Sequence, residues 1–321
     1  MTLEDFLEEW NAPGDHVLVR TSGSTGQPKP MWVEKRRMEA SARITCAFLG
    51  LHAGDTALLC MPLDYIAGKM MVVRALTWGL RLVAIAPSGL PRWEGHVDFA
   101  AMVPMQVWNL LHDEAGRERL MQVRHLIIGG GAIDDALAAE LQTLPNHIWS
   151  TYGMTETLSH IAMRRLNGQQ ATEWYTPFEG VDVSLSDDQC LIVNAPAVHE
   201  GPLLTHDMAE IDGRRFRILG RRDNVICSGG IKIQAEEVER LLRPHLPLPF
   251  IITRARDAKF GQVVVLLTED DANAAAAVCR QVLPRYWQPR LVFTVGNIPL
   301  TGTGKPARAE AESMAEKLRG E

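Results

Sequence analysis

The sequence predicts an α/β protein: a large α/β domain with a parallel sheet and a small β subdomain, followed by a small α+β C-terminal domain. Three observations lead to this prediction. Short apolar runs alternate with amphipathic stretches from His16 to Ser150, short strands and turns follow from Glu179 to Leu219, and a compact strand and helix pattern begins after Arg222. We therefore expect domains at residues 1–222 and 223–321.

The alternation in the first part is typical of βαβ units. We expect strands at 17–19, 56–61, 80–86 and 123–128, and helices within 33–49, 67–78 and 134–141. In the β subdomain, Asp187-Asp188 and Asp212-Gly213 are turn signals. The last part predicts helices at 235–242, 272–283 and 307–318, and strands at 250–253, 263–267 and 291–295.

Composition excludes several classes of protein. A net charge of −6 argues against a general nucleic-acid surface, which would be basic. No uncharged apolar stretch reaches the roughly 20 residues that span a bilayer, and the acidic start Met1 to Trp10 does not resemble a secretion signal. The five cysteines are scattered without a CxxC pair, so we expect a reduced, cytoplasmic protein with no zinc site and no disulfide framework.

A hydroxyl- and glycine-rich loop follows the apolar run His16 to Val19. Its glycines free backbone N–H groups to converge on one point, and its hydroxyls and closing lysine add donors and a positive charge, which together suit phosphate oxygens. At the carboxyl end of a sheet strand such a loop would lie where ligands bind. It is not the common P-loop, because Lys29 follows Gln27-Pro28, and a solvated linker is the alternative. The candidate phosphate-binding residues are Thr21, Ser22, Gly23, Ser24, Thr25, Gly26 and Lys29.

Three later segments carry further chemistry. The segment from Ser150 to Thr157 offers an aromatic face, hydroxyls and Glu156, which could hold Mg²⁺ together with phosphate oxygens; otherwise its tyrosine is a core residue and Glu156 an exposed carboxylate. Thr205-His206-Asp207 and Gly220 to Asp223 could bind ribose hydroxyls or form an ordinary surface salt bridge. Lys305 ends a glycine-rich loop, as a solvated lysine or as a mobile cation delivered to a reaction centre.

Taken in order, these segments resemble the adenylate-forming superfamily of acyl-CoA synthetases, adenylation domains and luciferases. The loop is similar to the superfamily's [ST]SG[ST]TGxPK motif. The segment Tyr152–Glu156 is similar to its YGxTE motif, and the segment Thr205–Asp207 is similar to its TGD motif. Gly220 to Ile233 resembles GRxDxxIxxGGxKI, and Pro299 to Lys305 resembles PxTxxGK. The resemblance implies a two-step reaction in which a carboxylate attacks the α-phosphate of ATP, and a thiol, usually of coenzyme A, then displaces AMP.

The resemblance also implies roles for individual residues. Thr155 would bond the α-phosphate, Glu156 would bind Mg²⁺, and Lys305 would stabilise negative charge during adenylation. Asp223 would be the hinge about which the small domain rotates, bringing Ser228, Gly229 and Gly230 to line the coenzyme A tunnel. The residues implied for adenine and ribose are Gly129, Gly130, Gly131, Ala132, Thr151, Tyr152, Gly153, Met154, Asp207 and Arg221.

Within the superfamily, the chain most resembles o-succinylbenzoate–CoA ligases of menaquinone biosynthesis. Pro62 to Gly68 is similar to their PLxHIxG element, with Tyr65 in place of histidine, and Thr155 to His160 is similar to the segment after their YGxTE motif. Because the acid is a dicarboxylate, a second cation is needed for the carboxylate that does not react. The candidate acid-binding residues are Tyr65, Lys69, Arg74, Ser159 and His160.

Other interpretations remain open. Lys69 and Arg74 could instead form a solvated helix face; if Lys69 binds the acid, Lys69→Ala should raise the KM for the acid without impairing ATP binding. The chain could activate another aryl or short-chain acid, load a carrier protein, or be a non-catalytic nucleotide-binding relic. Only Met1 to Arg20 precede the phosphate loop, which is short for the superfamily, so we expect a compact version in which dimerisation replaces missing packing partners.

Overall fold

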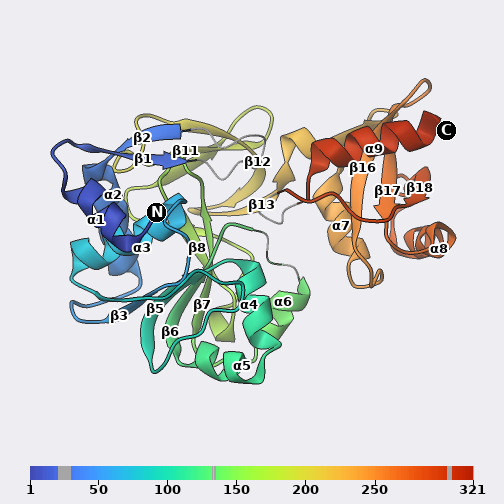
Figure 1. Cartoon of the computed structure of the whole chain (residues 1–321). Helices are drawn as coiled ribbons and strands as arrows, with labels where there is room; N and C mark the ends of the chain where they lie inside the picture. The colour runs from blue at the N-terminus through green and yellow to red at the C-terminus, as the bar shows by residue number, and fades with distance from the viewer. Residues whose placement is uncertain (21–29, 132, 134, 302–305, 321) are drawn as a thin grey trace. The chain divides into compact units, whose positions relative to one another are not determined.

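The computed structural model describes residues 1–20, 30–131, 133, 135–301 and 306–320. By its internal contacts the chain divides into two compact units (Figure 1). The first unit comprises Met1–Ser184, Ile192–Leu203 and Ile211–Arg217, and the second comprises Leu185–Leu191, Leu204–Glu210 and Ile218–Glu321. The domain boundary expected at residue 222 stays a prediction.

A seven-stranded sheet forms the centre of the first unit, in the order β4-β3-β5-β6-β7-β8-β9. The strands from β4 to β7 run parallel, and β8 and β9 run antiparallel at one end of the order. The expected α/β class with a largely parallel sheet is confirmed. The strands are β3 (Thr56–Leu59), β4 (Arg81–Ala84), β5 (Val97–Met102), β6 (Val123–Ile128), β7 (His147–Gly153), β8 (His160–Arg165) and β9 (Thr176–Pro177).

Helices accompany this sheet in two groups. Figure 1 shows α4, α5 and α6 together beside β6 and β7, and α1, α2 and α3 together near the N-terminal strands. In α3, eight residues from Gly68 to Ala75 are buried, which makes it the most enclosed helix of this group. The helices are α1 (Leu3–Asn11), α2 (Lys35–Phe48), α3 (Ile66–Trp78), α4 (Pro104–Leu111), α5 (Glu114–Met121), α6 (Asp135–Leu141) and the short 3₁₀ helix η1 (Gly168–Gln170).

One expectation about the first strand is wrong. β1 (His16–Arg20) does not join the parallel sheet; it pairs with β2 (Pro30–Glu34) in a separate antiparallel sheet. Val17, Val19 and Val33 are buried while Trp32 is 66% exposed, which is the alternation of a half-buried hairpin rather than of a central strand. The phosphate loop therefore lies between two hairpin strands, and the helix expected from residue 33 begins at Lys35.

A third sheet forms the expected β subdomain and contributes residues to both units. Its order is β10-β11-β12-β13, and both expected turns are confirmed at its hairpins. Gln189, next to Asp187-Asp188, has a φ of 61°, and Gly213 has a φ of 60°. The strands are β10 (Asp182–Leu185), β11 (Cys190–Asn194), β12 (Leu203–Asp212) and β13 (Arg215–Arg221).

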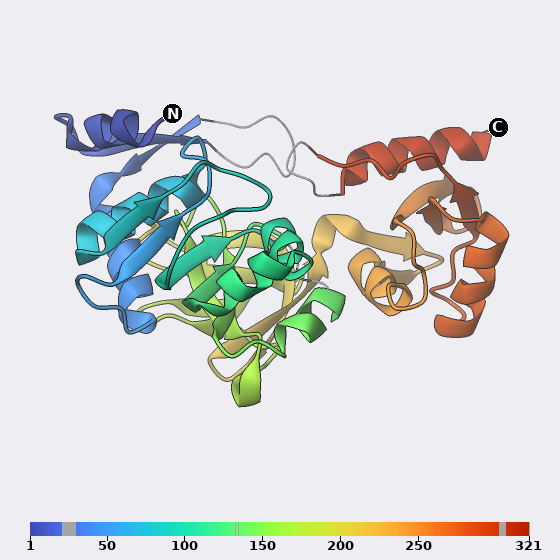
Figure 2. The same cartoon turned by 60° about the horizontal axis from the view of Figure 1, so that its bottom comes forward.

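The second unit holds a five-stranded sheet with helices on both faces (Figure 2). Ile252, Val264 and Leu266 pack with α7 and α8, whereas their neighbours Ile251, Val265 and Leu267 pack with α9, because successive strand residues face opposite sides. The predicted helices and strands of this part are confirmed. The elements are η2 (Arg222–Asn224), β14 (Val225–Ser228), β15 (Ile231–Gln234), α7 (Ala235–Leu242), β16 (Phe250–Asp257), β17 (Gly261–Thr268), α8 (Ala272–Val282), β18 (Leu291–Thr294) and α9 (Arg308–Gly320).

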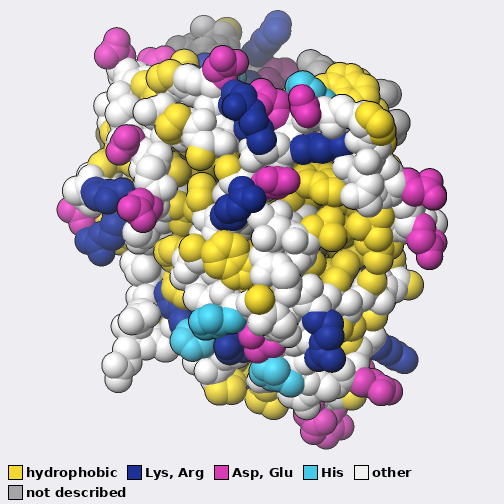
Figure 3. Space-filling model, turned by 90° about the vertical axis from the view of Figure 1, so that its left-hand side faces the viewer, with side chains coloured by type: hydrophobic (Ala, Val, Ile, Leu, Met, Phe, Trp, Pro, Cys, Tyr) yellow, Lys and Arg dark blue, Asp and Glu magenta, His cyan; other side chains and the backbone are white. Residues whose placement is uncertain are grey.

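On the face shown in Figure 3, basic and acidic side chains are interspersed among hydrophobic ones, without a large basic field. Among the described residues, no helix has the length and apolar character needed to cross a membrane.

Candidate active site

The turn between β7 and β8 is built around Gly153 and Thr157. A Cβ at Gly153 would lie 2.3 Å from the Ser159 carbonyl oxygen, so only glycine lets the two strands approach at the bulge where the ladder changes register. The buried Thr157 hydroxyl accepts a hydrogen bond from the Met154 N–H at 3.1 Å and donates to the Ser159 carbonyl at 2.7 Å. The turn thus holds Thr155 half-buried and Glu156 exposed at its tip.

Tyr152, the last residue before this turn's glycine, is 9% exposed. Its ring meets Phe216 edge to face at 5.1 Å and Tyr175 at 5.9 Å. Tyr175 is held in turn by a hydrogen bond of 2.8 Å between its hydroxyl and that of Ser150. The rings of Phe216 and Tyr175 therefore hold the ring of Tyr152 in place.

The glycine strip after β6 packs closely against neighbouring elements. A Cβ at Gly129 would lie 2.5 Å from the Thr151 hydroxyl of β7, and one at Gly131 would lie 3.4 Å from Pro104 at the start of α4. Gly130 has a φ of 76°, a conformation that favours glycine. Thr151 itself donates to the Ile128 carbonyl at 3.2 Å, so strip and strand are joined by a hydrogen bond as well as by packing.

A chain of hydrogen bonds joins three of the candidate acid-binding residues. The Arg74 Nη2 donates to the Ser159 hydroxyl at 2.6 Å, that hydroxyl lies 3.2 Å from His160 Nδ1, and His160 Nε2 lies 2.9 Å from the Thr45 hydroxyl. Because Thr45 donates to the Ser41 carbonyl at 3.0 Å, it accepts from Nε2–H. A neutral His160 then accepts at Nδ1 from Ser159. Each group in the chain therefore donates to the next, from Arg74 through Ser159 and His160 to Thr45.

The charges in this chain are set by burial. Arg74 is 2% exposed, its Nε has no hydrogen-bond partner, and no ion pair to it occurs among the residues that the structure describes. Burial lowers the pKa of Arg74 to about 10, which leaves it charged near neutral pH. Burial, reinforced by the Arg74 charge, also lowers the pKa of His160 well below its ordinary value, in agreement with the neutral ring assigned above.

The other acid-side candidates lie apart from this chain. The Lys69 ammonium is 2.9 Å from Glu9 Oε2 and 2.9 Å from the Leu18 carbonyl, and Lys69 is 2% exposed. Tyr65 precedes α3 and is 41% exposed. A solvated helix face for Lys69 and Arg74 is therefore wrong, since both side chains are buried.

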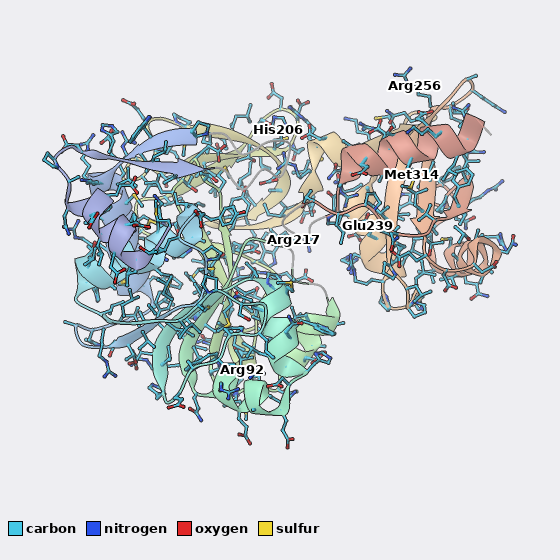
Figure 4. All side chains as sticks on the ribbon, in the orientation of Figure 1. Arg92, His206, Arg217, Glu239, Arg256 and Met314 are labelled. Carbon is cyan, nitrogen blue, oxygen red and sulfur yellow. The ribbon has the colours of Figure 1, made fainter. Side chains whose placement is uncertain are left out.

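In the second unit, the candidate ribose and hinge residues form one polar cluster. Arg221 donates to Asp207 at 3.2 Å and to Asp223 at 3.3 Å, and His206 Nδ1 lies 2.8 Å from Asp223. Desolvation raises the pKa of Asp223, but hydrogen bonds and charge from His206 and Arg221 outweigh it and lower the pKa below its ordinary value. Figure 4 labels His206, which lies on β12.

The candidate coenzyme A segment is the tight turn between β14 and β15. Gly229 and Gly230 have φ values of 59° and 85°, so both need the freedom of glycine. The Gly229 N–H donates to the Phe260 carbonyl at 2.9 Å, and a Cβ there would lie 3.0 Å from the Phe260 ring. Ser228 ends β14 and pairs with Gly261 of β17.

Comparison with known proteins identifies the family of the chain. The model of the AMP-binding enzyme family matches residues 6–206. The chain belongs to the AMP-binding enzyme family. It is 33% identical to the acyl-CoA synthetase (AMP-forming)/AMP-acid ligase II-like protein of Dyadobacter fermentans, covering 97% of this chain and 92% of that one with a TM-score of 0.66.

Two further proteins that are similar to this chain carry more specific names. The 2-succinylbenzoate–CoA ligase of Salmonella typhimurium is 29% identical over 85% of this chain, and the chain spans 63% of that ligase's length. The o-succinylbenzoate coenzyme A synthetase of Bacillus subtilis, solved with ATP and magnesium, has a TM-score of 0.75 at 22% identity, covering 91% of this chain and 69% of that one. The latter likeness shows the shared fold.

Several candidate residues of this AMP-binding family member lie outside the described part of the chain. They are the phosphate-loop residues Thr21, Ser22, Gly23, Ser24, Thr25, Gly26 and Lys29, together with Ala132 and Lys305. Their roles stay predictions. The described candidates form three polar or packed groups, namely the β7–β8 turn with the glycine strip, the Arg74 chain and the Arg221 cluster, while Tyr65, Lys69 and the turn from Ser228 to Gly230 lie outside these groups.

Among the described residues, Glu156 offers a carboxylate that fits a magnesium ion bound together with a nucleotide. Mg²⁺ in nucleotide sites is held by one or two carboxylates, with phosphates and waters as the other ligands. Glu156 supplies one exposed carboxylate at the tip of its turn, and within the described residues no group of three or more His, Cys, Asp or Glu could hold a metal by itself. Glu156 can therefore supply the single protein carboxylate that a nucleotide-bound magnesium ion needs.

Sequence reasoning missed two residues that shape the site. Thr157 holds the β7–β8 turn, and Thr45 on α2 fixes the tautomer of His160 from 115 positions away in the chain. Thr157 directly follows the YGxTE-like segment, so its place was a usable signal. Thr45 gave none, since only the packing of α2 brings it to His160.

Proposed function

We propose that the chain is an ATP-dependent acid–CoA ligase that forms an acyl-adenylate and then a coenzyme A thioester, with o-succinylbenzoate as the best candidate acid. The carboxylate attacks the α-phosphorus of ATP and pyrophosphate leaves; the thiol sulfur then attacks the acyl carbon, AMP leaves and the thiol proton passes to solvent. Membership of the AMP-binding family and the geometry of the β7–β8 turn support the first step.

The observation that carries the choice of acid is the buried charge of Arg74. A guanidinium that is 2% exposed, has an unused Nε–H and has no described acidic partner is costly to bury, and an anionic ligand would offset that cost. A dicarboxylic acid supplies such an anion with the carboxylate that does not react. Arg74 would bind that carboxylate through its unused donors, while Ser159 and His160 hold the guanidinium in place.

The remaining proposed roles rest on the motifs that the chain shares with the superfamily. Tyr152, supported by Tyr175 and Phe216, would pack on adenine beside the strip from Gly129 to Ala132. Thr155 would bond the α-phosphate, the phosphate loop would hold the β- and γ-phosphates, and Asp207 with Arg221 would hold the ribose hydroxyls. Mg²⁺, held by Glu156 and phosphate oxygens, would neutralise charge on the phosphates.

The proposed later step depends on the second unit. Lys305 would stabilise the charge that develops during adenylation, and rotation at Asp223 would then replace it with the segment from Ser228 to Gly230 for thioester formation. The ligands proposed are thus ATP, Mg²⁺, coenzyme A and a carboxylic acid.

Pyrophosphate exchange with a panel of acids tests the substrate. Exchange with o-succinylbenzoate but not with benzoate or succinate supports the proposal. Exchange only with monocarboxylic acids would show that o-succinylbenzoate is not the substrate and would contradict the proposed role of Arg74. Transfer of the acyl group to a carrier protein instead of coenzyme A would contradict the proposed thiol acceptor. No exchange with any acid would favour a nucleotide-binding relic.

The Lys305→Ala variant tests the mechanism. We expect the rate of adenylation to fall at least about a hundredfold, because a cation at the developing charge is lost, while thioester formation from supplied acyl-adenylate stays close to the unsubstituted rate. Lys317→Ala, an exposed lysine of α9, is the control. Equal loss of both half-reactions in Lys305→Ala would contradict the proposed exchange of the two segments.

A further inference from the structure

Lys69 is one of the most enclosed charged side chains of the described chain, and its partners lie on α1 and β1. It projects from α3 and is 2% exposed, and its ammonium lies 2.9 Å from Glu9 Oε2 of α1. The same ammonium donates to the Leu18 carbonyl of β1 at 2.9 Å and lies 5.0 Å from the centre of the Phe6 ring. One buried cation therefore joins α3, α1 and β1.

The backbone N–H and carbonyl of Leu18 both form hydrogen bonds with side chains. Its N–H donates to Glu9 Oε1 at 3.1 Å, and its carbonyl accepts from Lys69. β1 belongs to a two-stranded sheet, in which Leu18 pairs with Trp32 of β2. Because a strand in such a sheet has neighbours on one side only, Glu9 and Lys69 take the place of a third strand along its other edge.

We infer that Lys69 and Glu9 clamp β1, the strand that precedes the candidate phosphate loop in the sequence, and that this clamp is needed for full ATP affinity. Lys69 is thus a positioning residue for the nucleotide and not a ligand of the acid. β1 ends at Arg20, two residues beyond Leu18, and the loop from Thr21 to Lys29 follows directly. The inference rests on the proposed function only for the part that the loop binds ATP.

The electrostatics favour this role over acid binding. The Lys69 ammonium already has a carboxylate, a carbonyl and an aromatic ring as neighbours, so an incoming acid would have to displace Glu9. Arg74, five residues later on the same helix, has no described acidic partner. The helix α3 therefore carries two buried cations with different tasks: Lys69 toward the nucleotide strand and Arg74 toward the acid.

The test compares ligand affinities of the full chain by calorimetry, using MgATP and o-succinylbenzoate as probes. In Lys69→Met, which keeps the apolar stem and removes the ammonium, we expect the Kd for MgATP to rise about tenfold or more and the Kd for the acid to change less than about twofold. Lys69→Arg should recover most of the MgATP affinity. Lys35→Met is the matched control, because Lys35 also reaches the end of α1, through the carbonyl of its C-cap residue Ala12, but does so at the surface.

Hydrogen exchange gives a second reading that needs no ligand. The Leu18 amide should exchange at least about tenfold faster in Lys69→Met and in Glu9→Gln than in the unsubstituted chain, while amides of β5 and β6 stay unchanged. Unchanged exchange at Leu18, or a loss of acid affinity with MgATP affinity intact, would overturn the inference. If the unsubstituted chain binds MgATP without forming adenylate, the proposed function fails. Calorimetry and hydrogen exchange would still test whether Lys69 and Glu9 clamp β1.

Discussion

At the scale of single residues, Arg74 and Gly153 show two ways in which the fold constrains this site. Gly153 is fixed by space, because any side chain would collide with the Ser159 carbonyl oxygen. Arg74 donates to Ser159 and Met71 and lies 5.9 Å from the centre of the Phe99 ring, but its charge is buried without an acidic partner among the described residues. A buried charge that costs stability and has no acidic partner is a candidate for function.

Arg74→Met should separate stability from acid binding. Removing an unpaired buried charge and keeping most of the volume should leave the free energy of unfolding within about 1 kcal/mol of the unsubstituted chain or above it. The KM for o-succinylbenzoate should rise about 10- to 100-fold, the loss of a charge-assisted hydrogen bond. Urea unfolding and steady-state kinetics check the two effects, with the exposed Arg81→Met as control. Strong destabilisation with unchanged KM would assign Arg74 to packing.

A second prediction concerns His125 of β6. Burial, followed by the charges of His147, Arg124 and Arg165, lowers the pKa of His125 from 6.5 to about 4, and its ring stacks on His147 at 4.9 Å. The folded chain thus binds this proton less readily than the unfolded chain does. The stability from the neutral ring is present above the unfolded value of 6.5 and is lost as pH falls toward 4.

The expected result is a lower urea midpoint at about pH 5 than near neutral pH, and a smaller difference between the two in His125→Phe. His52→Phe, an exposed histidine, serves as control and should keep the difference. An equally large pH effect in His125→Phe would show that other groups cause it.

At the scale of elements, the β7–β8 connection decides how the catalytic candidates are presented. A tight bulge at Gly153, a left-handed Leu158 with a φ of 65° and the buried hydroxyl of Thr157 together fix six residues between two antiparallel strands. Thr155 and Glu156 lie at its tip; the Thr155 carbonyl accepts a hydrogen bond from the Leu158 N–H at 2.9 Å, but neither side chain takes part in the contacts named above. The turn can therefore be weakened without removing either of them.

Thr157→Val should show this. The change leaves the Met154 N–H and the Ser159 carbonyl without their hydroxyl partner, which costs about 1–3 kcal/mol of stability. The adenylation rate constant should fall about tenfold or more, because Thr155 and Glu156 lose their fixed positions. Pyrophosphate exchange and thermal unfolding measure the two effects, and Thr143→Val in an exposed turn is the control. Normal exchange in a destabilised Thr157→Val would refute the role of the turn.

The elements also show where pattern reading succeeds and where it fails. The helices α7, α8 and α9 and the strands β17 and β18 were predicted to within two residues of their ends, because the helices have clear helical spacing and the strands are apolar runs. β16 was predicted four residues too short, and β14 and β15 were not predicted. β1 was assigned to the wrong sheet, since three apolar residues in a row fit a central strand and a hairpin equally well. Which partner such a strand takes is decided by distant chain segments.

At the scale of the whole molecule, the two units have separate cores, and the second unit depends on a partly buried ion pair. Arg308, at the start of α9, binds Glu239 of α7 with both of its terminal nitrogens, at 3.0 and 2.8 Å, and donates to the Ile252 carbonyl of β16. Glu239 and Met314 are labelled in Figure 4 on α7 and α9. The pair thus ties together two helices that cover opposite faces of one sheet.

Arg308→Met should weaken the second unit selectively. Leaving Glu239, whose side chain is 8% exposed, without its cation costs about 3–5 kcal/mol. Amides of β16 and α7 should exchange faster, whereas amides of β5 and β6 in the first unit should not change. Hydrogen exchange with mass spectrometry measures both, and the exposed Arg285→Met is the control within the same unit. Faster exchange in both units alike would mean that they unfold together.

By itself, the sequence determined the α/β class, the β subdomain, most elements of the second unit and the family, because these depend on local spacing and on short motifs. Tertiary structure alone decided that Lys69 and Arg74, five residues apart on one helix, have different partners, and that Thr45 orients His160. Residue spacing on α3 predicts which side chains share a face but not what α1, β1 and β8 bring to that face. Contacts between distant segments form only when the chain packs, so the partners of a buried charge cannot be read from its neighbours in sequence.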